Sequence, residues 1–291
     1  MAANCPDPTA AELDDVQEFV SKLWELDINR FEPGRDYALN LGHGKKPWQV
    51  HDAAGDLLFK FVNKDKFFNT PTYRAMYSLL DNYERGCDEE EVVTREEKKE
   101  NWQFLDAVLD TPCGAYMHKY LVAKGLADVN ERDFKRDLYQ MWFALYRRDG
   151  ELSSSGFEHV FIGEESRGKI TGLHSWIQTF ILERKGELNY KGYILPRRKH
   201  RSAEDDADED DHVLTVQFDW GEESKSVSTM FLGVSPEFEL SLYTALFLLG
   251  KEEGKESYEL DIEDKDVRVR LYRIKSKYGD KVGSAFPELM E

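Results

Sequence analysis

Apolar side chains in the first half of the chain recur at the three- and four-residue spacing of amphipathic helices. Thr9 followed by Glu12, and Thr94 followed by Glu97, are capping-box patterns, which mark helix starts because the two side chains satisfy exposed backbone amides. Pro71 suits a first helical position. The spacing predicts buried helix faces at Val16, Phe19, Val20, Leu23 and Trp24, at Tyr73, Met76, Tyr77, Leu80 and Tyr83, at Trp102, Phe104, Leu105 and Val108, and at Phe134, Leu138, Met141, Trp142 and Leu145.

The pattern changes at about Ser153, after which short segments alternate with the two-residue period of strands. Residues 157–162 predict a strand that carries Phe157, His159 and Phe161 on one face and Glu158, Val160 and Ile162 on the other. A helix with Leu173, Trp176, Ile177, Phe180 and Ile181 on its buried stripe follows. Further predicted elements are strands at 213–220, 230–234, 258–262, 267–274 and 282–286, a helix from Pro236 to Leu249, and a turn at 278–280.

This order of elements predicts an α+β fold, because helices and strands are segregated along the chain instead of alternating as βαβ units. We expect a single domain over residues 8–290, with a mainly helical lobe at 8–150 and an α+β lobe with antiparallel sheets at 151–290. The 291 residues are 41% hydrophobic, which is enough for a substantial core.

The net charge restricts how such a protein could bind a polyanion. With 57 acidic and 39 basic residues the formal charge is −18, which argues against a broad basic surface for nucleic acid and against polybasic membrane binding. Residues 156–200, however, hold eight basic and five acidic side chains. Any nucleic-acid contact is therefore expected in one small, locally positive cleft.

One segment has an unusual charge distribution. A basic run at 197–201 precedes residues 204–211, of which seven are acidic. Blocks of like charge usually stay solvated, so we expect a loop between strands. A cation site is the alternative, and it would need oxygen atoms that converge at fixed geometry.

The cysteines and the beginning of the sequence bear on the compartment. Cys5, Cys87 and Cys113 are odd in number and far apart, which suits neither a disulfide framework nor a zinc site of the CxxC type. No stretch is long and apolar enough for a membrane span, and the first 30 residues carry seven acids without an apolar core. We expect a cytoplasmic or nuclear protein without a membrane partner, or a secreted one if an export signal has been removed.

Common enzyme signatures are missing from the sequence: it contains neither nucleotide-binding glycine fingerprint, and neither HExxH nor GxSxG. Two histidines remain as candidates. A single histidine is more often structural, but a strand, a glycine-rich turn and a helix start can bring His159 and His174 to one cleft. The helix dipole would lower the pKa of His174, so a neutral His174 beside a protonated His159 would supply a base and an acid.

A reaction at phosphate would also need a cation directed at the oxygens that gain charge in the transition state. Lys225 is the only lysine between Lys199 and Lys251, and it lies just before a predicted strand. A lone loop lysine is more often solvated, and spacing alone does not decide between the two interpretations.

Several segments together resemble the EndoU family of poly(U)-specific endoribonucleases, of the XendoU type. The similar stretches are 156–164, 172–176, 189–193, Lys225 and 231–239, preceded by 23–30 and 79–84, so that the resemblance covers about residues 16–289. It implies an EndoU-like fold whose C-terminal lobe is catalytic. It also implies cleavage of single-stranded, uridine-rich RNA that is stimulated by Mn²⁺ or Ca²⁺ and leaves a 2′,3′-cyclic phosphate and a 5′-hydroxyl.

The resemblance implies a role for each catalytic candidate. His174 takes the proton of the 2′-hydroxyl, His159 protonates the departing 5′-oxygen, and Lys225 stabilises the charge of the phosphorane. Glu158 and Glu164 match two glutamates described as important in the family. Because the alternation puts Glu158 on the strand face opposite His159, we expect an orienting or cation-linked role for it. The metal ligands themselves are not indicated.

Base selection is implied at three further positions. In coronaviral relatives, a serine four residues after the lysine and an aromatic residue near the C-terminus contact the uracil. Thr229 and Phe286 match them here, and Ser284 replaces a threonine of the vertebrate pattern. Thr229 keeps a hydroxyl group, whereas Phe286 can stack on a base but lacks the phenol of the tyrosine found in many members.

Two other functions fit parts of the same sequence. One is a non-catalytic RNA-binding module that keeps the fold, and the other is an acidic interaction protein that responds to Ca²⁺ or Mn²⁺ through the acidic run. The complete set of His159, His174 and Lys225 favours the endoribonuclease. We expect this enzyme to act as a monomer and not to cleave DNA, which lacks the 2′-hydroxyl.

Overall fold

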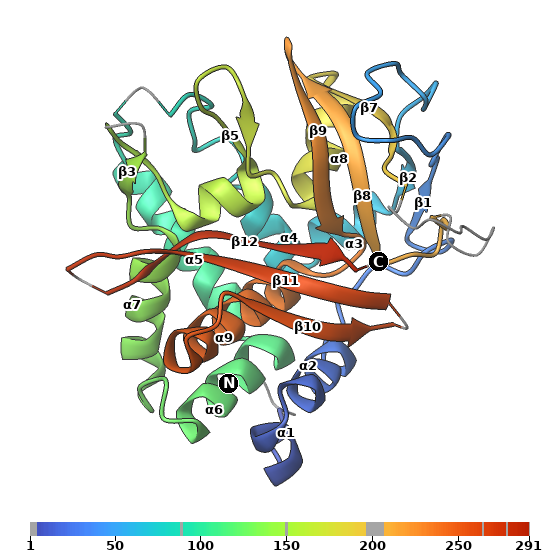
Figure 1. The fold of residues 1–291 in the computed structure, drawn as a ribbon. Coiled ribbons are helices and arrows are strands. Elements are labelled where there is room, and N and C mark those ends of the chain that lie inside the picture. The colour runs from blue at the N-terminus through green and yellow to red at the C-terminus, as the bar shows by residue number, and fades with distance from the viewer. Residues whose placement is uncertain are drawn as a thin grey trace.

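Helices are the main regular elements of the first half of the chain in the computed structural model, which describes residues 5–87, 90–148, 151–195, 207–263, 265–277 and 279–290 (Figure 1). Both predicted capping boxes are present, at the starts of the first and the fifth helix. The elements in chain order are α1 (Ala10–Asp14), α2 (Val16–Glu25), β1 (Tyr37–Leu39), β2 (Phe59–Val62), α3 (Lys64–Asn69), α4 (Pro71–Tyr77), α5 (Arg95–Leu109), α6 (Pro112–Ala123) and α7 (Glu131–Trp142).

Strands dominate the second half, as the alternating pattern predicts. Its elements are β3 (Tyr146–Arg148), β4 (Glu151–Ser154), the π-helical turn η1 (Glu158–Ile162), β5 (Glu164–Glu165), β6 (Ile170–Thr171), α8 (Trp176–Lys185), β7 (Leu188–Tyr193), β8 (Val213–Trp220), β9 (Glu223–Phe231), α9 (Pro236–Glu253), β10 (Ser257–Ile262), β11 (Lys265–Ile274) and β12 (Lys281–Leu289). Helices combined with antiparallel strands confirm the predicted α+β class.

The second half of the chain contains two three-stranded antiparallel sheets. Strands β7, β8 and β9 form one sheet, and β10, β11 and β12 form the other. The second sheet crosses the middle of the molecule, and its strand β12 contacts both β8 and β9 of the first (Figure 1). The last strand, β12, therefore lies against β8 and β9 and joins the two sheets.

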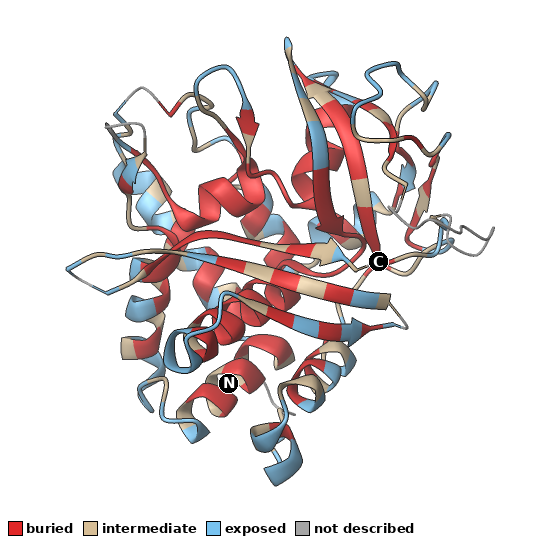
Figure 2. Ribbon diagram, viewed as in Figure 1, coloured by how far each residue is buried: buried red, intermediate tan, exposed pale blue. Residues whose placement is uncertain are grey.

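Helix α9 forms the centre of the core. It is buried along most of its length and contacts α2, α4, α5 and α6 from the first half and β11 and β12 from the second (Figure 2). The indole of Trp142 in α7 donates a hydrogen bond of 2.9 Å to Thr244 of α9. Because both halves of the chain pack on the same helix, the site rests on one continuous hydrophobic core.

The predicted strand at 157–162 is wrong, because this segment forms the helical turn η1. The Ser155 hydroxyl accepts a hydrogen bond from the Glu158 amide at 3.2 Å, and the Glu158 carboxylate accepts one from the Ser155 amide at 3.2 Å. This reciprocal capping starts a helix. Every side chain of the turn is buried, so the pattern of apolar residues cannot distinguish a helical turn from a strand in this segment. Glu158 and His159 consequently do not lie on opposite faces of a strand.

Several other boundaries differ from the predictions, and helix α4 ends at Tyr77, before Leu80 and Tyr83 of the predicted helix face. The strand expected at 230–234 is β9, which begins at Glu223 and ends at Phe231, so Lys225 lies within the strand and not before it. The polar first half of β9 is exposed on alternate residues, which hides it from a search for apolar runs. The helix expected from Pro236 begins there, as predicted, and continues to Glu253.

Some predictions concern residues that lie partly or wholly outside the described ranges. The basic run at 197–201 and Tyr278 of the predicted turn lie outside the described residues, as do the first three positions of the acidic run. In the described part of that run, Glu209 pairs with Lys60 at 3.1 Å and Asp211 pairs with Lys265 at 2.7 Å.

Candidate active site

Backbone pairing brings the two candidate histidines together. The amide of Leu173 donates to the carbonyl of His159 at 3.1 Å, and the amide of His174 donates to the carbonyl of Val160 at 2.8 Å. Gly172 makes this approach possible. A Cβ atom at that position would lie 1.8 Å from the His159 carbonyl oxygen, and the φ of Gly172 is +65°.

His174 does not open the following helix, because α8 starts at Trp176 with Ser175 as its cap. Helix α8 is buried on all sides from Trp176 to Glu183, whereas the sequence predicts only one buried stripe. Leu173 precedes the helix and has a φ of +58°. The region around His174 is thus an irregular segment clamped between η1 and a fully buried helix, which is a rigid support for a side chain.

The ring of His159 is oriented by a buried carboxylate. Its Nδ1 lies 2.8 Å from Oε2 of Glu164, a residue with no solvent exposure. Since the carboxylate can only accept, Nδ1 carries the proton and Nε2 is the ring atom left for other chemistry. Burial is the largest effect and lowers the pKa of His159 overall, although the hydrogen bond and charge of Glu164 raise it in part.

Glu164 is itself held by two further side chains. The Ser154 hydroxyl donates to its Oε1, and Nε of Arg148 lies 3.3 Å from its Oε2. Burial raises the pKa of Glu164, but the hydrogen bonds from His159 and Ser154 and the charge of Arg148 outweigh burial and lower it. Glu164 is therefore ionised, and it stabilises a positive charge on His159.

The ring of His174 is also held through its Nδ1 atom. Its Nδ1 donates to the carbonyl of Thr229 at 2.9 Å, which again leaves Nε2 for other chemistry. The ring stacks on Phe286 with centroids 4.4 Å apart and an interplanar angle of 9°. Burial and the nearby charge of Lys225 lower the pKa of His174 well below its usual value. The sequence predicts the direction of this shift, but burial is its largest cause.

Lys225 reaches the same place from β9. Its Nζ donates to the carbonyl of Gly172, next to the pairing between the two histidine segments. Burial lowers the pKa of Lys225 to about 8, so the ammonium form prevails at neutral pH. Its charge acts on both His159 and His174, which places all three titratable groups in one neighbourhood.

The three predicted base-contact residues border this cluster. Thr229 follows Lys225 on β9, and its hydroxyl lies 2.9 Å from that of Thr215 on β8. Ser284 and Phe286 are two residues apart on β12, so their side chains share one face. The Ser284 hydroxyl is buried and has no hydrogen-bond partner among the described residues. All three side chains lie on strands that face the histidines.

Glu158 takes part in a different contact. Its carboxylate caps η1 and lies against Glu91, and burial together with the charges of Glu91 and Glu164 raises its pKa strongly. Burial and nearby carboxylates also raise the pKa of Glu91. Glu158 thus supports the turn that carries His159, and no hydrogen bond joins it to that imidazole in the described part of the chain.

The sequence gives no sign of Arg148 and Ser154. They lie on the short strands β3 and β4, and each reaches Glu164 only after the chain has folded. Gly172 belongs to the glycine-rich turn of the sequence. Its positive φ and its lack of a side chain allow the two histidine segments to approach each other.

A cavity of about 520 Å³ lies at the C-terminal end of η1 and not at the histidines. Gly163, Gln178 and Trp220 are among its lining residues, and none of His159, His174 and Lys225 is. We place the chemistry at the histidines, because paired titratable groups with perturbed pKa values and fixed geometry identify a reaction site better than volume does.

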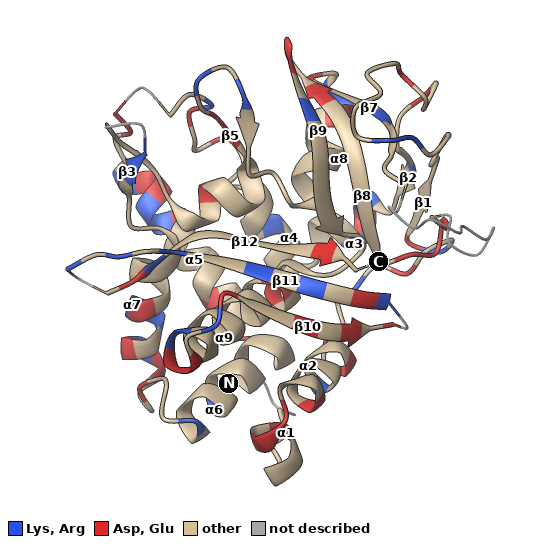
Figure 3. Cartoon of the chain, in the orientation of Figure 1, with Lys and Arg blue, Asp and Glu red and all other residues tan. Residues whose placement is uncertain are grey.

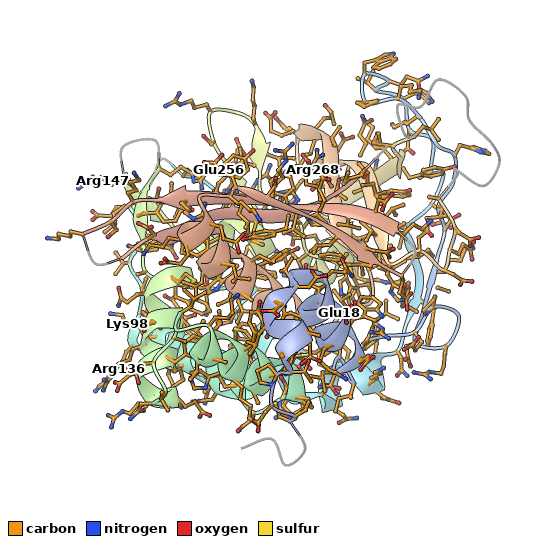
Figure 4. The ribbon with its side chains drawn as sticks, turned by 60° about the horizontal axis from the view of Figure 1, so that its bottom comes forward. Glu18, Lys98, Arg136, Arg147, Glu256 and Arg268 are labelled. Carbon is orange, nitrogen blue, oxygen red and sulfur yellow. The ribbon has the colours of Figure 1, made fainter. Side chains whose placement is uncertain are left out.

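The remaining charges are mixed and dispersed. Seen from the helical side, Glu18 of α2, Lys98 of α5, Arg136 of α7 and Arg268 of β11 come from separate elements (Figure 4). Arg136 pairs with Asp133 and Arg268 pairs with Glu259, and acidic and basic positions are interspersed in the rest of the fold (Figure 3). No helix in the described ranges is long and apolar enough to span a bilayer.

Comparison with known proteins connects this geometry to a family. The family model described as endoribonuclease XendoU matches residues 15–287. The chain is 40% identical over 288 residues to poly(U)-specific endoribonuclease-B of Xenopus laevis, which covers 95% of this chain and 94% of that one. It is 34% identical to the uridylate-specific endoribonuclease of Homo sapiens, with 92% of this chain and 63% of that one aligned.

A solved structure shares the whole fold. It is described as the structure of XendoU, a splicing-independent snoRNA-processing endoribonuclease, and it matches with a TM-score of 0.80 and 37% identity over 98% of this chain and 99% of that one. The resemblance seen in the sequence is confirmed by the family match, the relatives and the shared fold. The chain belongs to the XendoU family of endoribonucleases.

Proposed function

We propose that this protein cleaves single-stranded RNA at uridines by attack of the ribose 2′-hydroxyl on the adjacent phosphate. The observation that carries the proposal is the arrangement of two imidazoles, each fixed through Nδ1 and each with Nε2 left for chemistry, beside a partly buried ammonium group. Family membership and the names of the relatives supply uridine-containing RNA as the substrate.

In this mechanism Nε2 of His174 accepts the proton of the 2′-hydroxyl while the 2′-oxygen forms its bond to phosphorus. The bond from phosphorus to the 5′-oxygen then breaks, and Nε2 of His159 donates a proton to that oxygen. The products are a 2′,3′-cyclic phosphate and a 5′-hydroxyl. The lowered pKa of His174 keeps it neutral as a base, and Glu164 stabilises the protonated His159 as the acid.

Lys225 supplies the positive charge. Its ammonium group would donate to a non-bridging oxygen of the phosphorane, whose charge grows in the transition state. Thr229, Ser284 and Phe286 would contact the uracil, the first two through hydroxyl groups and Phe286 by stacking. All of these groups come from one chain, so we propose that a monomer is sufficient. DNA should not be cleaved, because it lacks the 2′-hydroxyl that attacks the phosphate.

A divalent cation, Mn²⁺ or Ca²⁺, is part of the proposal, and two oxygen atoms without hydrogen-bond partners among the described residues support one location for it. Glu91 and Asn101 line a small cavity with room for about one water molecule, and Oε2 of Glu91 and Oδ1 of Asn101 have no hydrogen-bond partner among the described residues. The Glu158 carboxylate lies against Glu91. Carboxylate and amide oxygens are the ligands that Ca²⁺ and Mn²⁺ prefer.

The cation would join the turn that carries His159 to the helical lobe. Among the described residues no three His, Cys, Asp or Glu side chains are arranged to hold an ion, so two carboxylates and one amide would share it with water. Glu164 does not fit as a ligand, since both of its oxygens are already bound by His159, Ser154 and Arg148. The bound ion would offset the repulsion between the carboxylates of Glu158, which is buried, and Glu91, which is partly buried.

The test is a cleavage assay with product-end analysis on a 12-nucleotide RNA that contains one uridine. We expect cyclic-phosphate and 5′-hydroxyl ends, and binding without cleavage when that uridine lacks its 2′-hydroxyl. His159→Ala and His174→Ala should each lower kcat by about 10²–10⁴-fold, the usual size of acid–base catalysis. His118→Ala, a histidine distant in sequence that bonds to Asp128, is the control and should keep full activity.

Cleavage of the deoxy substrate would disprove attack by the 2′-hydroxyl. Tight RNA binding without any cleavage, in the presence of Mn²⁺ or Ca²⁺, would instead support the non-catalytic RNA-binding module. Near-native turnover by His159→Ala or His174→Ala would refute the corresponding assignment.

A further inference from the structure

The loop 43–51 carries the most exposed tryptophan among the described residues. Trp48 is 77% exposed and Val50 is 76% exposed, although large apolar side chains usually gain by burial. The loop contains two lysines, two histidines and no acid, in a chain with a net charge of −18, although Lys45 is buried and its ammonium donates to the His51 carbonyl. An exposed indole in a loop without acidic residues suits stacking by single-stranded nucleic acid.

The loop is held in a fixed conformation. The Lys45 amide donates to the carbonyl of Tyr193 at 2.9 Å, and the Leu195 amide donates to the carbonyl of Lys45 at 2.9 Å. The Gln49 amide donates to the carbonyl of Lys46 at 3.0 Å, and the Gln49 side chain accepts from the Lys46 amide at 2.7 Å, which closes a turn around Trp48. Binding to Trp48 would therefore cost little ordering of the loop.

One side chain connects this loop to the strand that carries Lys225. Nε2 of Gln217 on β8 donates to the carbonyl of Pro47 at 3.1 Å and reaches the carbonyl of Ser226 at 3.5 Å. Pro47 directly precedes Trp48, and Ser226 directly follows Lys225. Trp48 is thus attached to β9 through a single amide group.

Gln217 lies close in the chain to a residue that contacts Thr229. Thr215 is two residues before Gln217 on β8, where the pairing with β9 shifts register between Val216 and Phe218, and the Thr215 hydroxyl lies 2.9 Å from that of Thr229. The loop lies beside β7 and β8, and basic positions mark it there (Figures 1 and 3). A strand of RNA with its uracil at Thr229 would extend along this sheet toward Trp48.

We propose that Trp48 is a stacking platform for a nucleobase of the RNA that lies beyond the two nucleotides joined by the cleaved bond. The inference rests on the proposed endoribonuclease function and extends it to a further nucleotide of the substrate. A single fixed indole on a loop without acidic residues suits a base, which offers a flat face whatever its identity. The contact would add affinity for longer RNA without selecting a sequence.

The experiment compares two substrates and two variants. Steady-state cleavage is measured on the dinucleotide uridylyl-adenosine and on a 12-nucleotide RNA with one uridine, for the native protein, Trp48→Ala and the matched control Val50→Ala. Trp48→Ala should raise KM for the 12-nucleotide RNA by about tenfold and leave kcat unchanged. Both variants should cleave the dinucleotide at the native rate, and Val50→Ala should match the native protein on both substrates.

A second measurement removes turnover from the comparison. Binding of the 12-nucleotide RNA with a 2′-deoxyuridine, followed by fluorescence anisotropy, should weaken about tenfold in Trp48→Ala and recover in Trp48→Phe, which keeps an aromatic face. Native affinity in Trp48→Ala would overturn the inference, as would an equal loss on the dinucleotide. Failure of the native protein to cleave either substrate would refute the proposed function itself.

Discussion

Gly172→Ala tests whether the close approach of the two histidine segments is the basis of activity. The added Cβ would lie 1.8 Å from the His159 carbonyl oxygen, whereas real Cβ atoms do not come within 3.0 Å of such an atom. The two backbones must therefore separate by about an ångström, and a misplacement of about 1 Å can lower a rate by about 10²-fold. The hydrogen bonds of Leu173 and His174 to η1 would be stretched or lost.

The cost to folding follows from the same geometry. Alanine at a φ of +65° costs about 1–2 kcal/mol, and the two hydrogen bonds contribute about 0.5–1.5 kcal/mol each. We expect a loss of about 2–5 kcal/mol in the free energy of unfolding, measured by urea denaturation. The loss in kcat for the 12-nucleotide RNA is expected to be about 10²-fold, measured where the variant is still fully folded.

Gly186→Ala is the control that separates the strain of a positive φ from the displacement of neighbouring backbone. Gly186 ends α8 with a φ of +74° and would place its Cβ more than 4 Å from any neighbour, so it shares the strain but not the clash. It should lose about 1–2 kcal/mol of stability and keep its native kcat. If Gly172→Ala had a kcat within about threefold of Gly186→Ala, the argument from close approach would be refuted.

Three further predictions concern charge, cation and base. Because the pKa of Lys225 is about 8 and its charge is lost as pH rises, kcat should fall above pH 8, and Lys225→Arg, whose guanidinium stays charged, should move or remove this decline in a pH–rate profile; an unchanged alkaline limb would show that another group causes it. Ca²⁺ or Mn²⁺ should raise the melting temperature, by an amount that corresponds to about 2.7 kcal/mol at 100 times the Kd, and Glu91→Gln should weaken this shift, whereas an equal shift in both proteins would rule Glu91 out as a ligand. Phe286→Tyr adds a hydroxyl near the base and should increase the preference for uridine over cytidine in competition cleavage, and an unchanged ratio would mean that residue 286 only stacks.

The sequence is most informative where local chemistry determines the structure. The capping boxes at Thr9 and Thr94 predict two helix starts correctly, because the hydrogen bonds that define them join residues three positions apart. The helix that begins at Pro236 is predicted for a similar reason. Alternation predicts β8, β10 and β11, and in β10 and the middle of β11 buried residues do alternate with more exposed ones, whereas β8 is buried at most positions.

Prediction fails where all residues of a segment are buried. In η1 the alternation of aromatic and polar residues imitates a strand, and only the capping pair of Ser155 and Glu158 indicates a helical turn. The orientation of His159 depends on Arg148 and Ser154, which reach Glu164 from separate strands. Such contacts depend on the tertiary arrangement, so a local pattern cannot encode them.

The position of β12 in the chain has a consequence for the order of events during synthesis. This strand carries Phe286, which stacks on His174, and its Gly283 carbonyl accepts a hydrogen bond from Arg148 at 3.1 Å. Translation produces β12 after every other element that contributes to the site. A nascent chain on the ribosome therefore holds both histidines and Lys225 well before it can complete the contacts that orient them. The site would therefore become complete only after β12 has been synthesised and has paired with β11.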